Sequence, residues 1–307
     1  MIVNVPNKFF KQNQSPIQRY VYFSISEEVL VDAIDVVYRE YFSILGACVQ
    51  RSNTAVLIAD SFGSPFEELK SQIQPELWSK VSGADVFYVR GLKPSRVSEI
   101  QNRTSESLRY SHMRPVQRTY DNLALNTKFK KIPSISVTKN EIFVNVSEGL
   151  RNLGLKSLAA YDFLYKSGYE IIYKTTLSSI INPNLFTKVI DSIDTDIPLY
   201  TGTVINLGKH QFVSGANLIL NRKVLSILLE RRGDWQHGFL DDVAIGRLLK
   251  NYMMDLGLRT KNLENLDDVK SLSAFDLSNI MHFRCKSSEE PRNDLDIMKS
   301  LLKRMCV

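Results

Sequence analysis

Residues 54–60 read Thr-Ala-Val-Leu-Ile-Ala-Asp, a short apolar run that ends in a carboxylate and is followed by turn-forming residues at 61–65. A run of this length between polar or turn-forming residues is typical of a buried parallel strand. A stretch with helical character follows over residues 65–80, and residues 84–91 form a second apolar run. Strand, helix and strand in this order predict a βαβ unit, and hence an α/β fold with a single, mostly parallel mixed sheet flanked by helices.

The second half of the chain continues this alternation. Apolar runs predict strands over residues 142–146, 169–174, 199–206 and 211–220, and the last two are close enough to pair across a turn at 207–210. Helical spacing and capping residues predict helices over 147–168, 182–193 and 221–232, and another that begins at Asp241. We expect residues 51–307 to form one domain, preceded by a partly helical N-terminal extension at 1–50. The polar segment 92–140 is expected to be a long loop or small insertion, where substrate contacts often lie.

Length, composition and charge limit the classes of protein that fit. At 307 residues and 44% hydrophobic, the chain is long enough to bury a sizeable core. Its net charge of +6 comes from basic residues that look scattered, with doublets such as Lys130-Lys131 and Arg231-Arg232. Scattered doublets favour an ordinary solvated surface over a nucleic-acid groove, so we expect no nucleic-acid partner.

The apolar runs and the cysteines of the sequence indicate in which cellular compartment the protein is expected. It contains no apolar run of the roughly 18–20 residues that a membrane span needs, and its first residues do not resemble a secretory signal. The three cysteines, Cys48, Cys285 and Cys306, are odd in number and lack paired spacing, which argues against a disulfide framework or a zinc site. We therefore expect a cytoplasmic protein without a transmembrane segment.

Two stretches carry the chemistry. The strand predicted at 211–220 contains the small residues Ser214, Gly215 and Ala216, and residues 238–246 place Asp241 and Asp242 at the start of a helix. A small-residue turn lets a ligand lie against the backbone, and a nearby carboxylate pair can orient and deprotonate a hydroxyl. The alternative for the two aspartates is purely structural, because acids at a helix N-terminus are favoured by the helix dipole alone.

Together with two earlier segments, 152–157 and the strand at 169–174 followed by Thr175-Thr176-Leu177-Ser178-Ser179, these stretches resemble the GT-A glycosyltransferases of the fringe and β-1,3-galactosyltransferase type. Residues 152–157, Asn-Leu-Gly-Leu-Lys-Ser, stand where that family has Asn-Leu-Thr-x-Lys-Thr. Residues 214–216 resemble its Ser-Gly-Gly or Ser-Gly-Ala turn, and 241–246 its Glu/Asp-Asp-Val-x-x-Gly motif. The resemblance covers roughly residues 54–286, with the four pieces in the family's order.

The resemblance implies transfer of a sugar from a nucleotide-sugar, most simply a UDP-sugar, to a glycan hydroxyl, with inversion at the anomeric carbon. Asp242 corresponds to the general base, and Asp241 would orient it or hold an acceptor hydroxyl. Asp60 and Ser61, at the end of the first strand, lie where nucleotides bind in open α/β sheets, and Lys156 carries the family lysine. Golgi members carry a membrane anchor, so a cytoplasmic enzyme of bacterial or viral type fits this chain better.

One departure concerns the metal. The family strand normally ends in Asp-x-Asp, whose carboxylates hold a divalent cation, whereas this chain has Thr176-Leu177-Ser178, as in a bacterial and viral branch with Lys/Arg-Thr-x-Leu-Ser-Ser. Neutral hydroxyls cannot balance such a cation, although they can bind phosphate or sugar. We therefore favour a metal-free enzyme, while Mn²⁺ or Mg²⁺ stays possible if His282 coordinates it with Asp194 or Asp196.

The donor and acceptor sites follow from this. The predicted donor-diphosphate contacts are Lys174, Thr176, Ser178, Ser179, His282, Arg284 and Lys286, since cations can neutralise a diphosphate as a metal would. The predicted acceptor contacts are Ser214, Gly215, Ala216, Trp235 and His237. The competing interpretations are surface charges for Arg284 and Lys286, and a buried loop anchor for Trp235. The rival function is a catalytically inactive GT-A fold that only binds a glycan or a nucleotide.

Overall fold

A computed structural model describes residues 52–305, apart from 101–103, 105–113, 129–130 and 208–209. The N-terminal extension predicted at residues 1–50 lies outside the described residues. In the described part of the chain, no helix combines the length and apolar character that crossing a membrane requires.

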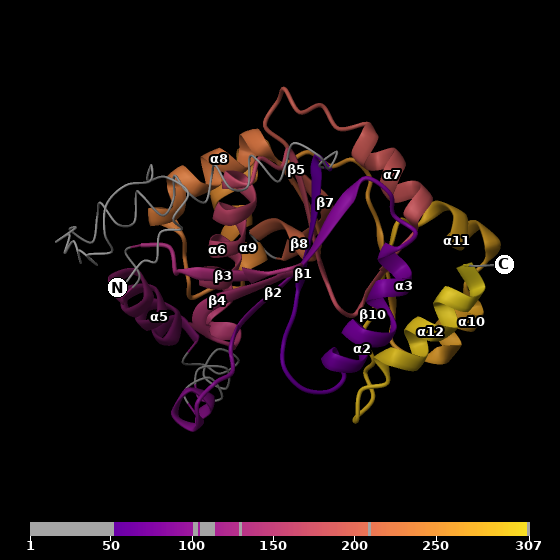
Figure 1. The fold of residues 1–307 in the computed structure, drawn as a ribbon, viewed down its shortest axis with the longest axis horizontal. Helices are drawn as coiled ribbons and strands as arrows, with labels where there is room; N and C mark the ends of the chain where they lie inside the picture. Colours follow the sequence, from indigo (N-terminus) through magenta and orange to yellow (C-terminus); the bar gives the residue numbers. More distant parts are fainter. Residues whose placement is uncertain (1–51, 101–103, 105–113, 129–130, 208–209, 306–307) are drawn as a thin grey trace, which may run out of the picture. The chain divides into compact units, whose positions relative to one another are not determined.

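The centre of the fold is a seven-stranded mixed sheet (Figure 1). In spatial order its strands are β3 (Ile135–Thr138), β4 (Glu141–Ser147), β2 (Ala84–Leu92), β1 (Thr54–Ala59), β5 (Ile171–Thr176), β8 (His210–Asn221) and β7 (Tyr200–Leu207). Strands β4, β2, β1 and β5 are parallel to one another. At the two sides of the sheet the pairs β3–β4, β5–β8 and β8–β7 are antiparallel. The predicted α/β class, the βαβ unit and the β7–β8 pairing are confirmed, and the arrangement is consistent with a GT-A-like fold.

Helices cover both faces of this sheet. One face packs against α6 (Leu153–Lys166), α8 (Arg222–Glu230) and α9 (Asp241–Leu249), and also against part of α5 (Arg114–Lys128). The other face packs against α2 (Phe66–Gln72), α3 (Gln74–Trp78), α7 (Pro183–Asp191), α10 (Leu266–Ser271) and α12 (Asp294–Met305), with α11 (Ala274–Asn279) beside them. Each face therefore has its own apolar core, as expected for strands that are buried on both sides.

A second sheet, which the sequence analysis did not predict, contains three short strands. Its order is β6 (Ser179–Ile181), β10 (His282–Cys285) and β9 (Thr260–Leu263). The central strand β10 pairs antiparallel with β6, which places Arg284 opposite Ser179. Since β6 follows directly after β5, this small sheet brings the C-terminal part of the chain to the carboxyl end of β5.

The segment 92–140 is not a long loop, because it contains the helix α5 and the edge strand β3. The inner face of α5 is polar and charged apart from Leu125, and its buried Asp121 forms an ion pair with Arg151. Most of its apolar residues lie on the outer face instead. The helix is mostly polar and has Pro115 near its start, so the segment looks like a loop although its few apolar residues recur at helical spacing.

Two glycines allow the helices around the carboxylate pair to approach their neighbours closely. A Cβ at Gly154 of α6 would lie 2.4 Å from Nε1 of Trp235, and a Cβ at Gly246 of α9 would lie 2.4 Å from Cβ of Phe212 in β8. Real Cβ atoms do not tolerate such contacts, so α9 sits against β8 and the Trp235 loop sits against α6 only because both positions are glycine.

Candidate active site

The carboxylate pair lies at the carboxyl end of the parallel strands, where β5, β8 and the N-terminus of α9 meet. Lys174 of β5 forms an ion pair with Oδ2 of Asp241, and both side chains are almost fully buried, with exposed fractions of 4% and 5%. Ser157 of α6 donates a hydrogen bond of 2.6 Å to the same carboxylate oxygen. A single oxygen of Asp241 therefore joins α6, β5 and α9.

Asp242 faces the small-residue segment of β8. Its Oδ2 accepts a hydrogen bond of 3.2 Å from the backbone N–H of Gly215, and its Oδ1 accepts one of 2.8 Å from the N–H of Val243. A Cβ at Gly215 would lie 3.3 Å from Nζ of Lys174 and 3.4 Å from Cβ of Asp242. The structure thus brings Lys174, Gly215, Asp241 and Asp242 together, and a side chain larger than hydrogen at position 215 would crowd them.

The pKa values of the two carboxyl groups are shifted in opposite directions. Burial raises the pKa of Asp242, and the adjacent negative charge of Asp241 raises it further, against the smaller opposing influence of Lys174 and two backbone N–H groups. Burial acts in the same direction on Asp241, but the charge of Lys174 and the hydrogen bonds from Lys174 and Ser157 together hold the pKa of Asp241 below its ordinary value. Asp241 is therefore the fixed anion, and Asp242 is the carboxylate that exchanges a proton more readily.

Two buried tyrosines lie behind the pair, and sequence reasoning did not identify them. Burial raises the pKa of Tyr161 well above its ordinary value, with Asp241 and Asp242 adding to the effect, and its hydroxyl has no hydrogen-bond partner among the described residues. Burial also raises the pKa of Tyr200, whose hydroxyl accepts a hydrogen bond of 2.8 Å from the backbone N–H of Val213. Tyr161 follows Ser157 by one helical turn, a spacing that could have marked both as facing the pair.

Arg284 provides a positive charge near Asp242. Its side chain is half-buried, and its guanidinium makes no hydrogen bond or ion pair with the described residues. Burial lowers the pKa of Arg284, the carboxylate of Asp242 opposes that change, and the nearby Arg292 adds to it. An arginine remains charged in any such environment, so this guanidinium is available to pair with an anion.

The hydroxyls predicted to contact the diphosphate are already hydrogen-bonded. Ser178 donates a bond of 2.7 Å to Oδ2 of Asp294, which is also the ion-pair partner of Arg292. Thr176 and Ser179 bond to each other at 2.9 Å. Of these three side chains, only that of Thr176 is partly exposed. Arg292, which lies near Arg284, had no sequence signal, whereas the predicted Lys286 is an exposed residue just beyond the end of β10.

The structure does not assemble the alternative metal site. His282 is fully buried, its Nδ1 bonds to Oγ1 of Thr260 at 2.9 Å, and its pKa is lowered to about 3 by burial and by the charge of Arg284, against the Ala216 carbonyl. Asp194 and Asp196 form an exposed turn, and Asp196 pairs with Lys223. His282 lies beside Ala216 of β8, whereas the carbonyl of Asp194 lies near Asn221 at the other end of that strand. The five residues from Ala216 to Asn221 span roughly 17 Å, so Asp194 is far from His282. Among the described residues, no group of three or more His, Cys, Asp or Glu side chains is arranged to hold a metal ion.

Asp60 and Lys156 belong to a separate polar network at the end of β1. The buried carboxylate of Asp60 accepts bonds from the N–H of Ser61 at 2.7 Å and from Lys70 at 2.8 Å. Lys156 donates to the carbonyl of Asp60 at 3.0 Å and forms an ion pair of 2.6 Å with Glu148. Lys156 therefore fixes the end of β1 against α6, and is not left free to contact a donor as predicted.

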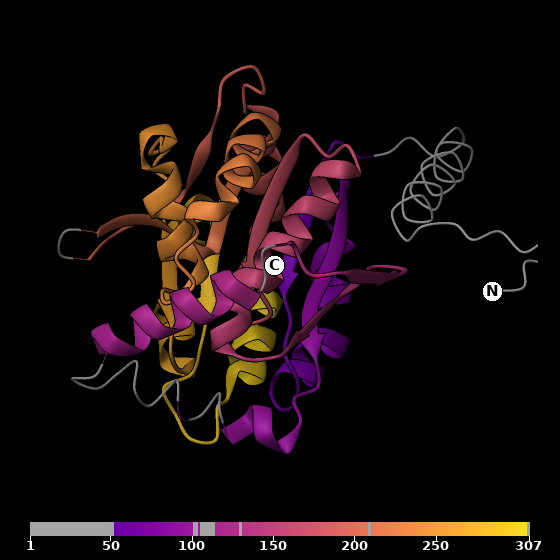
Figure 2. The same ribbon diagram turned by 90° about the vertical axis from the view of Figure 1, so that its left-hand side faces the viewer.

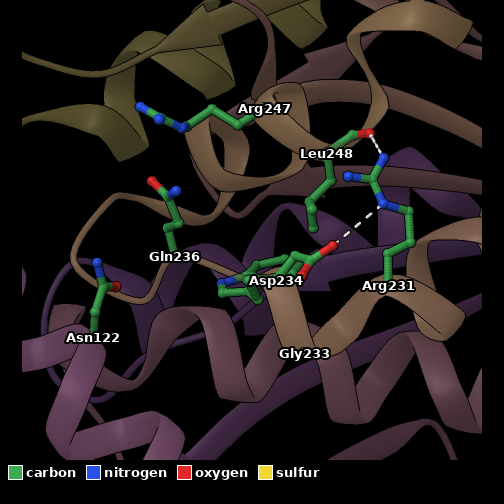
Figure 3. Close-up of a pocket in the computed structure, with 8 residues that line it drawn as sticks. Asn122, Arg231, Gly233, Asp234, Gln236, Arg247 and Leu248 are labelled. Carbon is green, nitrogen blue, oxygen red and sulfur yellow. Dashed lines mark hydrogen bonds and ion pairs between the residues drawn. The ribbon is translucent and has the colours of Figure 1, made fainter.

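The predicted acceptor loop is only partly accessible. Trp235 is 1% exposed, and His237 is also buried, so that its pKa is lowered to about 4 by burial, which the charge of Asp121 opposes. Trp235 is thus the loop anchor of the competing interpretation. An open hollow of about 510 Å³ lies beside it (Figure 3). Arg231, tied to Asp234 and to the Leu248 carbonyl, forms one side of this hollow, and Gln236 and Arg247 lie on the other.

No family model matches this sequence, and no curated protein matches it either. The assignment of a function therefore depends on the chemistry of the residues around Asp241 and Asp242.

Proposed function

We propose that this chain is a glycosyltransferase that moves a sugar from a nucleotide-sugar, most simply a UDP-sugar, to a hydroxyl group of a glycan. The observation that carries the proposal is the carboxylate pair at the carboxyl end of the sheet. One carboxylate is neutralised by Lys174, and the other has a raised pKa beside a glycine. Near them lies Arg284, whose guanidinium makes no hydrogen bond or ion pair with the described residues. Ligands of open α/β sheets bind at this end of the strands.

Asp242 is the proposed general base. It would accept the proton of an acceptor hydroxyl as the hydroxyl oxygen forms a bond to the anomeric carbon and the bond to the diphosphate oxygen breaks. A base with a pKa nearer to neutral transfers protons more effectively than an ordinary aspartate, and such catalysis contributes about 10²–10⁴-fold. Asp241, held ionised by Lys174, keeps the pKa of its neighbour raised and fixes the N-terminus of α9.

The leaving diphosphate would be bound by Arg284, with Arg292 as a second, nearby cation whose charge is partly neutralised by its ion pair with Asp294. Charge-assisted bonds from guanidinium groups suit phosphate oxygens, and they supply electrostatic stabilisation as negative charge develops on the leaving group. A divalent metal does not fit the residues at the family's Asp-x-Asp position, because Thr176 and Ser178 are neutral and Leu177 is buried in the core. We therefore assign the diphosphate to the arginines, and no step to a metal.

The testing experiment measures hydrolysis and transfer across a panel of nucleotide-sugars, in parallel with Mn²⁺ and with EDTA. We expect turnover of at least one donor that survives EDTA and is lost in Asp242→Asn. The matched control is Asp267→Asn, since Asp267 is an exposed acid in the first turn of α10 and should have no effect. Turnover that requires Mn²⁺ would overturn the assignment of the diphosphate to the arginines alone. Nucleotide binding without turnover of any donor would favour the catalytically inactive rival.

A further inference from the structure

Positive charge is concentrated in one segment of the chain. Residues 93–131 contain nine Lys or Arg residues and three Asp or Glu residues, a net charge of +6 that equals the net charge of the whole chain. The remainder is therefore neutral overall. Doublets of basic residues are spread along the whole chain, but the excess of basic over acidic residues is confined to this segment.

The same segment exposes an apolar stripe. Val116, Tyr120 and Leu123 lie on one face of α5 at i, i+4 and i+7, and their exposed fractions are 60%, 58% and 70%. We call these three residues the α5 stripe. Val97 and Ile100, earlier in the segment, are 65% and 66% exposed. Single exposed apolar residues need no explanation, but a helical row of three within a basic segment does.

The α5 stripe points away from the core because the opposite face of the helix is anchored. Asp121 pairs with Arg151, Asn122 accepts a bond of 2.7 Å from the N–H of Gly238, and Leu125 is 3% exposed. The guanidinium of Arg118 stacks over Phe239 at 4.1 Å. In Figure 1 α5 lies at the left-hand side of the ribbon, and Figure 2 shows that side facing the viewer. Turning the stripe inward would break all of these contacts.

The charge at the start of α5 does not stabilise the helix. Its first turn contains no acid and begins with Arg114, although acids are the residues that the dipole favours at a helix N-terminus. Arg96, Arg114 and Lys131 are all exposed and have no carboxylate partner among the described residues. Free basic groups around an apolar helix face are the composition of a helix that lies in a membrane interface.

We propose that α5 and its basic flanks form a reversible binding surface for anionic lipid membranes. The α5 stripe would enter the boundary between head groups and acyl chains, and the basic residues would pair with lipid phosphates. A second copy of this chain fits less well, since a two-fold interface would place two copies of this basic segment against each other. Nucleic acid explains the charge but leaves the stripe facing water.

The test measures co-sedimentation of the full chain with vesicles of phosphatidylcholine alone, or with about one third phosphatidylglycerol, at about 0.1 M and about 0.5 M salt. We expect binding to the anionic vesicles to be at least tenfold tighter than to neutral ones, and to weaken with salt. The stripe variant (Val116→Ser, Tyr120→Ser, Leu123→Ser) should lose at least tenfold in affinity. A charge variant (Arg96→Gln, Arg114→Gln, Lys131→Gln) should lose affinity and much of its salt dependence.

The matched control replaces three exposed apolar residues outside the segment, Ile197, Leu207 and Phe275, by serine, and should bind as the parent does. Equal binding to both vesicle types, or an equal loss in this control, would overturn the proposal. The ring of Tyr120 lies 5.6 Å from the guanidinium of Arg151, so the stripe variant should lose a little thermal stability without lipid. A loss well beyond that of a single exposed contact would also overturn the proposal, because it would show that the whole stripe packs against protein. Equally tight binding of a single-stranded oligonucleotide that does not depend on the stripe would point to nucleic acid instead. None of these results depends on glycosyl transfer.

Discussion

Replacing Lys174 by methionine removes the positive charge that neutralises Asp241. Both side chains of this ion pair are at most 5% exposed, so water cannot compensate the carboxylate that is left behind. Breaking a buried pair by removing one partner costs about 3–5 kcal/mol, a large share of the roughly 5–15 kcal/mol that stabilises a typical domain. In urea unfolding, this corresponds to a decrease in the midpoint of about 1–2 M.

The sign of the pH dependence provides a second test. In the parent, the lowered pKa of Asp241 adds stability that is complete above the unfolded value of 3.8 and is lost as the pH falls through the folded value. In Lys174→Met, the unpaired buried carboxyl has a raised pKa, so the variant gains stability as the pH falls. The gap between parent and variant should therefore be smaller at about pH 5 than at about pH 7.

A double variant keeps the reasoning open to refutation. Asp241→Asn removes the charge but keeps an oxygen that can accept the bond from Ser157, so Lys174→Met with Asp241→Asn should recover at least half of the lost stability. A loss below about 1 kcal/mol in the single variant, or no recovery in the double variant, would show that Lys174 does not neutralise Asp241.

Four further results are expected. Asp242→Asn should reduce turnover about 10²–10⁴-fold, while its urea midpoint at pH 7 stays equal or rises, because the raised pKa means that the ionised group is disfavoured in the folded state. For the same reason, kcat/KM of the parent should increase with pH through a pKa above that of an ordinary aspartate; a profile that falls over this range would contradict Asp242 as the base. Gly215→Ala, which places a Cβ 3.3 Å from Nζ of Lys174, should lower kcat while circular dichroism shows an intact fold. Arg284→Gln should weaken UDP binding by calorimetry about tenfold, as expected for a lost charge-assisted bond, whereas Lys286→Gln should not; equal losses would argue against a specific site.

Most of the fold could be predicted because long strands and amphipathic helices leave a periodic record. The run at 54–60 became β1, and the helix expected at Asp241 begins at that residue. The small sheet was missed because its strands have three or four residues, too few to show a period. Helix α5 was missed because its residues are mostly polar, although its few apolar residues recur at helical spacing and face outward.

The candidate site was only partly predictable, because spacing along the chain does not reveal partners. Asp241, Asp242 and Gly215 were expected to lie together, and they do. Lys174 was expected to face a diphosphate, but it pairs with Asp241 from a strand that lies far away in the sequence. Arg292 belongs to a loop without any motif, so only the structure places it near Arg284.

The shared oxygen of Asp241 has a consequence for how the chain tolerates changes in length. Moving α9 by one residue would rotate its side chains by about 100° and shift them about 1.5 Å, which would carry Asp241 away from Ser157 and Lys174 at once. The connection before α9 is also anchored, at Trp235 on Gly154 and at Gly238 on Asn122. We expect single-residue insertions or deletions at 235–240 to abolish the site, whereas the exposed stretch at 254–257 should accept them with the site intact.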